Sequence, residues 1–157
     1  MIVDSEGNMI TKTVINTLFV NIKKTNPNAV IPKYAKEGDA CMDLVAVEKF
    51  LDDFGNTCYN TGLAFEIPPG FVGLVYPRSS VSKTDMNLRN CVGVIDSGYR
   101  GPVVLKFREY DHSLFNYKIG DRVAQLMIMP YPQVQFTEVD QLSDSDRGVG
   151  GFGSTGS

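Results

Sequence analysis

The chain has 157 residues, of which 43% are hydrophobic and 21% are charged, values near the average for a soluble globular protein. A single domain of about this length buries roughly 68–70% of its unfolded surface, so it forms a core without disulfide or metal staples. The net charge of −3 and the pI of about 5.1 argue against broad electrostatic attraction to nucleic acid or to an anionic membrane. Any phosphate that this protein binds must therefore be held by a few placed Arg and Lys residues.

The cysteine and histidine content excludes several kinds of site. Cys41, Cys58 and Cys91 form no CxxC pair, and no secretory h-region precedes them. We therefore expect reduced thiols and a cytoplasmic location. The single histidine, His112, excludes a multi-histidine metal site, and its polar neighbours indicate a solvated loop. No apolar stretch approaches the ~20 residues that a membrane helix needs.

The predicted elements follow a polar N-terminal extension at residues 1–13. Short runs rich in β-branched and aromatic residues alternate with turn residues, a spacing that favours an all-β sandwich or barrel over βαβ units. A helix of one or two turns is predicted at 79–87, with Ser79 or Ser80 as its N-cap. The expected strands are 14–22, 41–47, 57–67, 71–76, 103–108, 123–129 and 134–139.

The last eleven residues, 147–157, hold five of the chain's 15 glycines. Such a composition is flexible and costly to order, which is typical of a disordered terminus. Arg147 and Phe152 favour a functional tail instead, because a purely solvating segment has no use for a guanidinium followed by a large aromatic ring. We therefore separate a β domain at 14–146 from a flexible tail at 147–157.

Three segments carry side chains that can do chemistry. Pro77-Arg78-Ser79-Ser80 ends a strand pattern and opens the helix candidate, which suits a phosphate, or else the serines merely cap a helical turn. Asp96 stands at a turn where it either bonds its own backbone or places a carboxylate beside a ligand, with Tyr99 as a flat wall. Gln125 interrupts an apolar strand, so its amide either braces the core or faces a polar ligand.

Taken in order, these segments resemble the trimeric deoxyuridine triphosphatase (dUTPase) family over roughly residues 20–157. Cys41-Met42 stands where the family often has Gly and an aromatic residue, and Gly98 where many members have Asp, but no catalytic position is lost. All five motifs of the family are present, at 39–46, 77–80, 93–101, 120–126 and 147–156.

The resemblance implies a fold and a reaction. The fold is a jelly-roll-like, distorted β-barrel subunit that assembles as a homotrimer, with each active site between subunits and the tail as a lid. The reaction is the Mg²⁺-dependent hydrolysis of dUTP to dUMP and pyrophosphate. This reaction keeps uracil out of DNA and supplies dUMP for thymidylate synthesis, and it involves no direct contact with nucleic acid or membrane.

The resemblance also implies roles for single residues at the phosphates. Asp96 is the expected general base that activates water, a contribution worth ~10²–10⁴ in rate. Asp43 is expected to contact Mg²⁺ through a metal-bound water, while the triphosphate itself holds most of the ion. The expected phosphate contacts are Arg78, Ser79, Ser80, Gln125 and Arg147.

The nucleoside contacts are implied in the same way. Tyr99 would stack on the deoxyribose and exclude a 2′-hydroxyl, and Phe152 would stack on the uracil, a contact worth ~1–3 kcal/mol. Gly153, Ser154 and Thr155 would close over the nucleotide with it. The uracil pocket would be formed, mostly through backbone groups, by Asn90, Cys91, Val94, Ile95 and Val104.

Three other functions are compatible with parts of the pattern. A dCTP deaminase shares the fold, but its chemistry needs a group, usually a glutamate, that acts at C4 of the base. A nucleotide-responsive interaction with a regulatory protein, through residues 1–13 or 81–88, would be an added role. A generic β-sandwich binding module leaves Arg147 and Phe152 unexplained.

Overall fold

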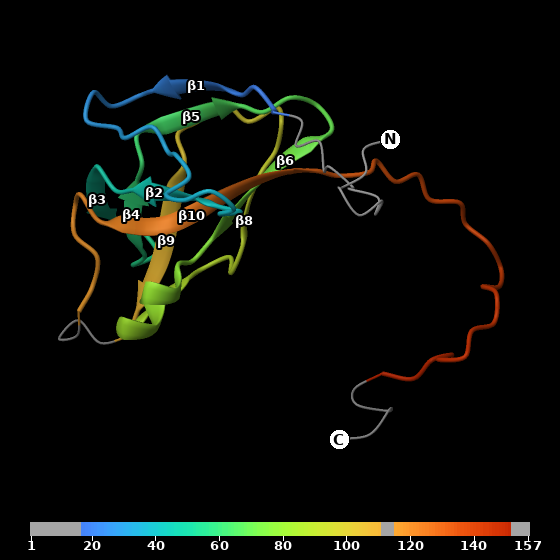
Figure 1. Cartoon of the computed structure of the whole chain (residues 1–157). Coiled ribbons are helices and arrows are strands. Elements are labelled where there is room, and N and C mark those ends of the chain that lie inside the picture. The colour runs from blue at the N-terminus through green and yellow to red at the C-terminus, as the bar shows by residue number, and fades with distance from the viewer. Residues whose placement is uncertain (1–16, 111–114, 152–157) are drawn as a thin grey trace, which may run out of the picture.

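The computed structural model describes residues 17–110 and 115–151. Over these residues the fold is all-β, as predicted, with one short 3₁₀ helix, η1 (Ser79–Lys83) (Figure 1). The strands are β1 (Asn21–Lys24), β2 (Met42–Val45), β3 (Glu48–Leu51), β4 (Thr57–Asn60), β5 (Leu63–Glu66), β6 (Phe71–Tyr76), β7 (Met86–Leu88), β8 (Gly93–Ile95), β9 (Val104–Glu109) and β10 (Arg122–Pro130).

The strands form antiparallel sheets. One four-stranded sheet has the order β2-β10-β6-β8, and a second has the order β3-β4-β9-β7. β1 and β5 form a separate two-stranded sheet. Among the described strands β8 pairs with β6 alone, so one edge of its backbone keeps free N–H and C=O groups.

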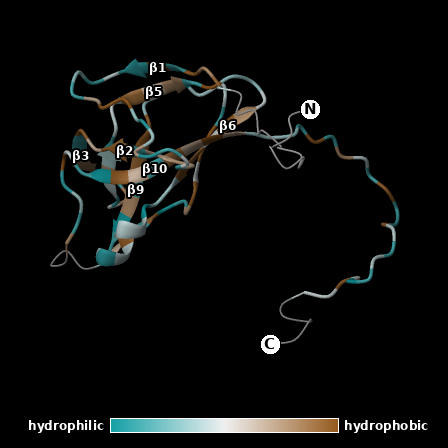
Figure 2. Cartoon of the chain, in the orientation of Figure 1, coloured by the Kyte–Doolittle hydropathy of each residue, from teal (hydrophilic) through white to brown (hydrophobic). Residues whose placement is uncertain are grey.

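The hydrophobic core takes residues from both four-stranded sheets. Tyr59 of β4, Phe107 of β9 and Tyr117 are buried and meet edge to face, with ring centroids 5.7–6.2 Å apart. The buried Tyr59 hydroxyl donates to the Tyr117 carbonyl at 2.8 Å, so this polar group keeps a partner inside the core. Figure 2 shows the contrast between a largely hydrophilic β1 and the more hydrophobic β5 below it.

The predicted run at 57–67 is two strands rather than one. The break falls at Thr61-Gly62, and Gly62 adopts a φ of +65°. A Cβ at Gly62 would lie 2.7 Å from the Cβ of Asn26, so the turn requires glycine for its conformation and for space. The prediction at 71–76, in contrast, coincides with β6.

The predicted helix at 79–87 is wrong in its second half. η1 ends at Lys83, its N-cap is Arg78, and no side chain caps it, so the expected N-cap role of Ser79 or Ser80 is wrong as well. The remainder is β7, in which buried Met86 and Leu88 flank exposed Asn87 and pair with β9. The alternation of buried and exposed residues covers only three positions here, which is too few to distinguish a strand from the end of the predicted helix.

The ends of the described chain differ from the predicted strands. β1 begins only at Asn21, near the end of the predicted run at 14–22. Residues 134–139 form no strand, because the chain leaves the β body after Pro130 and continues as an extended arm, residues 131–151 (Figure 1). Phe136 on this arm is 90% exposed. A strand needs a hydrogen-bonding partner, and the described residues offer this segment none.

Candidate active site

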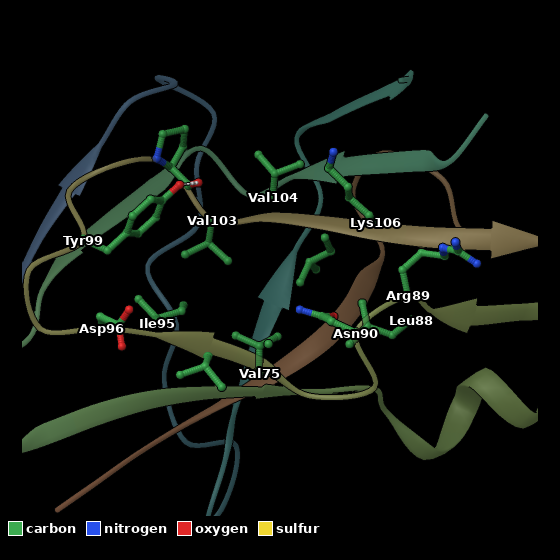
Figure 3. Close-up of a pocket in the computed structure, with 14 residues that line it drawn as sticks. Val75, Leu88, Arg89, Asn90, Ile95, Asp96, Tyr99, Val103, Val104 and Lys106 are labelled. Atoms are coloured by element: carbon green, nitrogen blue, oxygen red, sulfur yellow. Dashed lines mark hydrogen bonds between the residues drawn. The ribbon is translucent and has the colours of Figure 1, made fainter. Parts of the chain in front are cut away.

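One candidate site is a cavity of about 530 Å³ between the free edge of β8 and strand β9 (Figure 3). This volume is within the range of small-molecule pockets, about 300–1,000 Å³. Six of the residues predicted to contact or act on a nucleotide line it: Asn90, Val94, Ile95, Asp96, Tyr99 and Val104.

The β6–β8 pairing positions the acidic residue of this cavity. Ile95 is buried at the end of β8 and pairs with Gly73 of β6, which anchors the strand. Asp96 follows at once and is exposed, with its carboxylate at the edge of the cavity (Figure 3). Cys91, which was predicted to contact uracil, is exposed in the turn before β8 with a φ of 58° and is not among the lining residues.

Tyr99 forms one wall of the cavity, and local contacts hold its ring. Its hydroxyl donates to the Pro102 carbonyl at 3.1 Å, and its N–H donates to the Asp96 carbonyl at 3.0 Å. A Cβ added at Gly101 would overlap the Tyr99 hydroxyl, so only glycine allows the ring to lie there. The aromatic wall and the carboxylate therefore belong to one turn with one conformation.

A second group of predicted residues lies at one end of the first sheet. β10 runs between β2 and β6, so Gln125 stands opposite Asp43 on one side and Tyr76 on the other. Arg78 follows Tyr76 by two residues, and its Nε donates to Asp43 Oδ1 at 2.6 Å. Gln125 Nε2 donates to the Pro77 carbonyl at 3.1 Å, so its amide braces this end of the sheet.

Arg122 completes this group, which we name the arginine cluster: Asp43, Arg78, Ser80 and Arg122. Arg122 Nη1 donates to Asp43 Oδ2 at 3.1 Å, and Arg78 Nη1 donates to Ser80 Oγ at 3.3 Å. Two guanidinium groups against one carboxylate leave a net positive charge, which suits a phosphate chain. Ser79, the remaining predicted phosphate contact nearby, is exposed.

The sequence patterns missed three residues of this region. Arg122 lies three residues before Gln125 in the same motif. Its sequence neighbours do not indicate that it pairs with Asp43. Lys83 and Tyr117 line the same hollow as Arg78 and Ser80. Their lysine and tyrosine side chains are common on any surface, and only the fold brings them to the cluster.

The described residues lack a protein cage for a metal ion. Within residues 17–110 and 115–151, no group of three or more His, Cys, Asp or Glu side chains could hold one. Asp43 is the acid of the arginine cluster, and a single carboxylate fits an ion that arrives mainly bound to phosphate oxygens. Burial and the Asp43 carboxylate raise the pKa of the Cys41 thiol, which keeps that thiol protonated.

The cavity between β8 and β9, which we call the nucleoside-sized cavity, shares no lining residue with the arginine cluster. Arg147 lies on the extended arm, where its Nε donates to the Gly150 carbonyl at 3.0 Å. The predicted contacts Phe152, Gly153, Ser154 and Thr155 lie outside the described residues. One chain therefore places the predicted site residues in separate groups. In the described part of the chain, no helix has the length and apolar character to cross a membrane.

An all-β fold that carries a cavity of this volume and a separate arginine cluster defines a protein suited to a small ligand that bears phosphate. Residues 27–156 match the sequence profile of the dUTPase family, and the chain belongs to that family. This result confirms the resemblance that the five motifs indicated.

Individual relatives agree with the family assignment. The deoxyuridine 5'-triphosphate nucleotidohydrolase of Picosynechococcus sp. is 39% identical over 141 residues, covering 88% of this chain and 99% of that protein. The protein of the same name from Clostridium kluyveri is 40% identical over 137 residues, covering 86% of this chain and 96% of its own. A solved structure of a mutant Staphylococcus bacteriophage 80alpha dUTPase with dUpNHpp has a TM-score of 0.76 at 29% identity, covering 90% of this chain and 100% of that chain.

Proposed function

We propose that this protein hydrolyses dUTP to dUMP and pyrophosphate in the presence of Mg²⁺, with Asp96 as the catalytic base. The observation that carries the proposal is the position of Asp96, which is exposed at the edge of the 530 Å³ cavity directly after β8. Relatives that match most of the chain are named for this activity, and the 80alpha dUTPase was solved with dUpNHpp, an imido analogue of dUTP.

The free edge of β8 supports selection of uracil. Uracil offers O4 as an acceptor and N3–H as a donor, whereas cytosine reverses both. Backbone N–H and C=O groups at an edge strand have fixed positions, so they satisfy one base and leave unpaired polar atoms against the other. Such mismatches cost up to ~10⁴-fold in specificity. Asn90, Val94, Ile95 and Val104, which line the cavity, are the residues we assign to this pocket.

Tyr99 supports selection against ribose. Its ring is held by the hydrogen bond to Pro102 and by its packing over Gly101. A ring held in this position leaves no room for a 2′-hydroxyl on a sugar stacked against it. UTP is therefore a poor substrate in this proposal.

Asp96 acts on the water. Its carboxylate accepts a proton from a water molecule as that water attacks the α-phosphorus, and pyrophosphate leaves. General-base assistance is worth ~10²–10⁴ in rate, so the remaining acceleration must come from positioning and from charge stabilisation at the phosphates.

The arginine cluster supports binding of the triphosphate. Arg78, Ser79, Ser80 and Gln125 are the residues we assign to the phosphate oxygens, with Asp43 orienting Arg78 through the 2.6 Å contact. When bound to the triphosphate, Mg²⁺ supplies neutralisation of charge on the phosphate oxygens. Asp43 would contact this ion through a water molecule.

The separation of the two groups supports a site that is shared between subunits. The nucleoside-sized cavity and the arginine cluster share no lining residue, which fits a substrate that takes its contacts from more than one chain. We therefore propose a homotrimer in which the arm, residues 131–151, carries the tail to a neighbouring subunit. Arg147 would then contact the terminal phosphate, and Phe152 would stack on the uracil with Gly153, Ser154 and Thr155 beside it.

We further propose that the protein acts in the cytoplasm. Cys41, Cys58 and Cys91 are all free thiols, which fits a reducing compartment.

A single assay tests the function. Purified protein with Mg²⁺ is incubated separately with dUTP, dCTP, dTTP and UTP, and pyrophosphate release and base deamination are measured. We expect cleavage of dUTP, with kcat/KM at least about 100-fold lower for the other three nucleotides, and no activity after removal of Mg²⁺. Conversion of dCTP to a deoxyuridine nucleotide would instead identify a deaminase.

The variant Asp96→Asn tests the assigned base. Turnover should be abolished, whereas binding of dUpNHpp should stay within about tenfold of the wild type, because general-base catalysis acts on the transition state rather than on binding. Asp53→Asn makes the same charge change at an exposed turn and should behave as the wild type. Equal loss of binding and turnover in Asp96→Asn would show that Asp96 has only a structural role.

A further inference from the structure

We propose that Arg100, Glu66 and Asn21 form a positioning network that holds the turn carrying Asp96 in its reactive geometry. The inference rests on the proposed function of Asp96. It assigns roles to three residues that touch neither the nucleoside-sized cavity nor the arginine cluster.

Packing holds the turn at residues 96–101 only weakly. Asp96, Gly98, Tyr99 and Arg100 are all exposed, and the turn lies outside the strands. A turn with few buried contacts opens at little cost in free energy. Its geometry therefore depends largely on hydrogen bonds, and those of Tyr99 to Asp96 and Pro102 are not the only ones.

Arg100 supplies hydrogen bonds to this turn from its own side chain. Its Nη1 donates to the Ser97 carbonyl at 2.7 Å and to the Tyr99 carbonyl at 3.1 Å. These two carbonyls belong to the residue after Asp96 and to the residue that forms the aromatic wall. One planar guanidinium thus joins the two functional parts of the turn, a geometry that a lysine ammonium does not reproduce.

Glu66 anchors Arg100 to a sheet outside the site. Arg100 Nη2 lies 3.4 Å from Glu66 Oε1, and the other carboxylate oxygen, Oε2, accepts a 2.7 Å hydrogen bond from Asn21 Nδ2. Asn21 and Glu66 are direct cross-strand partners of β1 and β5. The hydrogen bond from Asn21, together with the Arg100 charge, lowers the pKa of Glu66, which keeps this carboxylate ionised at neutral pH.

Because the Arg100–Glu66 ion pair is exposed, its role in positioning the turn can be distinguished from a role in stabilising the fold. The side chains of Arg100 and Glu66 are each 53% exposed, and ion pairs of this kind add little to stability. A displacement of about 1 Å at a reacting group, in contrast, costs up to ~10²-fold in rate. Loss of the network should therefore lower kcat while the protein stays folded.

The experiment compares Arg100→Gln, Arg100→Lys and Glu66→Gln with the wild-type full-length chain. We expect kcat for dUTP to fall at least about tenfold in Arg100→Gln and about threefold in Glu66→Gln, with little recovery in Arg100→Lys. Binding of dUpNHpp should change less than about threefold, and Tm should fall less than about 3 °C.

Glu48→Gln is the matched control. The Glu48 carboxylate also accepts side-chain hydrogen bonds from asparagines, Asn26 at 2.9 Å and Asn60 at 2.8 Å, but it makes no contact with the 96–101 turn. We expect its kcat to equal that of the wild type.

The double variant Glu66→Gln with Arg100→Gln tests whether Glu66 acts through Arg100. We expect no further fall in kcat beyond Arg100→Gln, because a residue that acts through another loses its effect when that residue is absent. Unchanged kcat in Arg100→Gln, a parallel loss of dUpNHpp binding, or additive losses in the double variant would overturn the proposal. A wild-type protein that fails to cleave dUTP would instead refute the proposed function.

Discussion

The Asp43 carboxylate offers a direct test of the arginine cluster. Its two oxygens accept separately from Arg78 Nε at 2.6 Å and from Arg122 Nη1 at 3.1 Å. The substitution Asp43→Asn keeps the shape of the side chain but turns an NH₂ donor toward one of the guanidinium groups. The two arginines then no longer share a charged anchor, and the contact that orients Arg78 for phosphate loses its charge.

The size of the effect follows from the exposure of the pair. The side chains of Asp43 and Arg78 are 24% and 23% exposed, which places them between a surface pair and a buried pair. The corresponding losses are ~0.2–1 kcal/mol and ~3–5 kcal/mol. We therefore expect a loss of about 2 kcal/mol, which corresponds to a Tm lower by about 4–8 °C. If the same energy orients Arg78, kcat/KM for dUTP falls about 30-fold.

The assay measures kcat/KM for dUTP by pyrophosphate release and Tm by circular dichroism. Asp53→Asn is the control. Like Asp43→Asn it removes one negative charge from a chain with a net charge of −3, but it does so at an exposed turn. A kcat/KM for Asp43→Asn within twofold of that control would refute the orienting role. A large rise in the Mg²⁺ concentration needed for half-maximal activity would support the water-mediated metal contact in addition.

Three further predictions concern the tail, pH and backbone. Deleting residues 147–157 should lower kcat at least about tenfold, with Tm unchanged because the arm is exposed; full activity would refute the lid. The Asn56 and Lys106 hydrogen bonds lower the pKa of Asp52, so its contribution to stability is present at neutral pH and is lost as the pH falls below about 4. The Tm difference between wild type and Asp52→Asn should therefore shrink from pH 7 to pH 3, and a constant difference would contradict this linkage. Gly62→Ala should cost about 2 kcal/mol by urea unfolding, more than Gly38→Ala, which has open space around its Cβ position; equal costs would exclude the steric cause.

Local patterns in the sequence predicted the strand class and most strand positions correctly. The run of β-branched and aromatic residues at 71–76 matches β6, in which such side chains pack on a half-buried surface. The same reasoning failed at 134–139, where a similar run has no strand partner in the described chain. It also failed at 86–88, because three residues carry too little periodicity to be distinguished from a helix end.

The residues of the proposed site could be singled out from their motifs, but their neighbours could not. Asp96 and Arg78 stand in short patterns whose residue types suggest chemistry without any fold. The pairing of Asp43 with Arg122 spans 79 residues, and that of Glu66 with Arg100 spans 34. A local sequence pattern does not reveal which residues pair over such separations.

Side-chain chemistry and strand propensity are properties of a few consecutive residues, so they could be predicted from the amino-acid sequence of this chain. Strand pairing is different, because it depends on which distant segments bury their apolar faces against each other. That pairing set Asp43 opposite Gln125, left one edge of β8 free beside the cavity, and brought Glu66 to the turn of Asp96. The proposed site depends on these long-range pairings, which the free energy of the whole core determines.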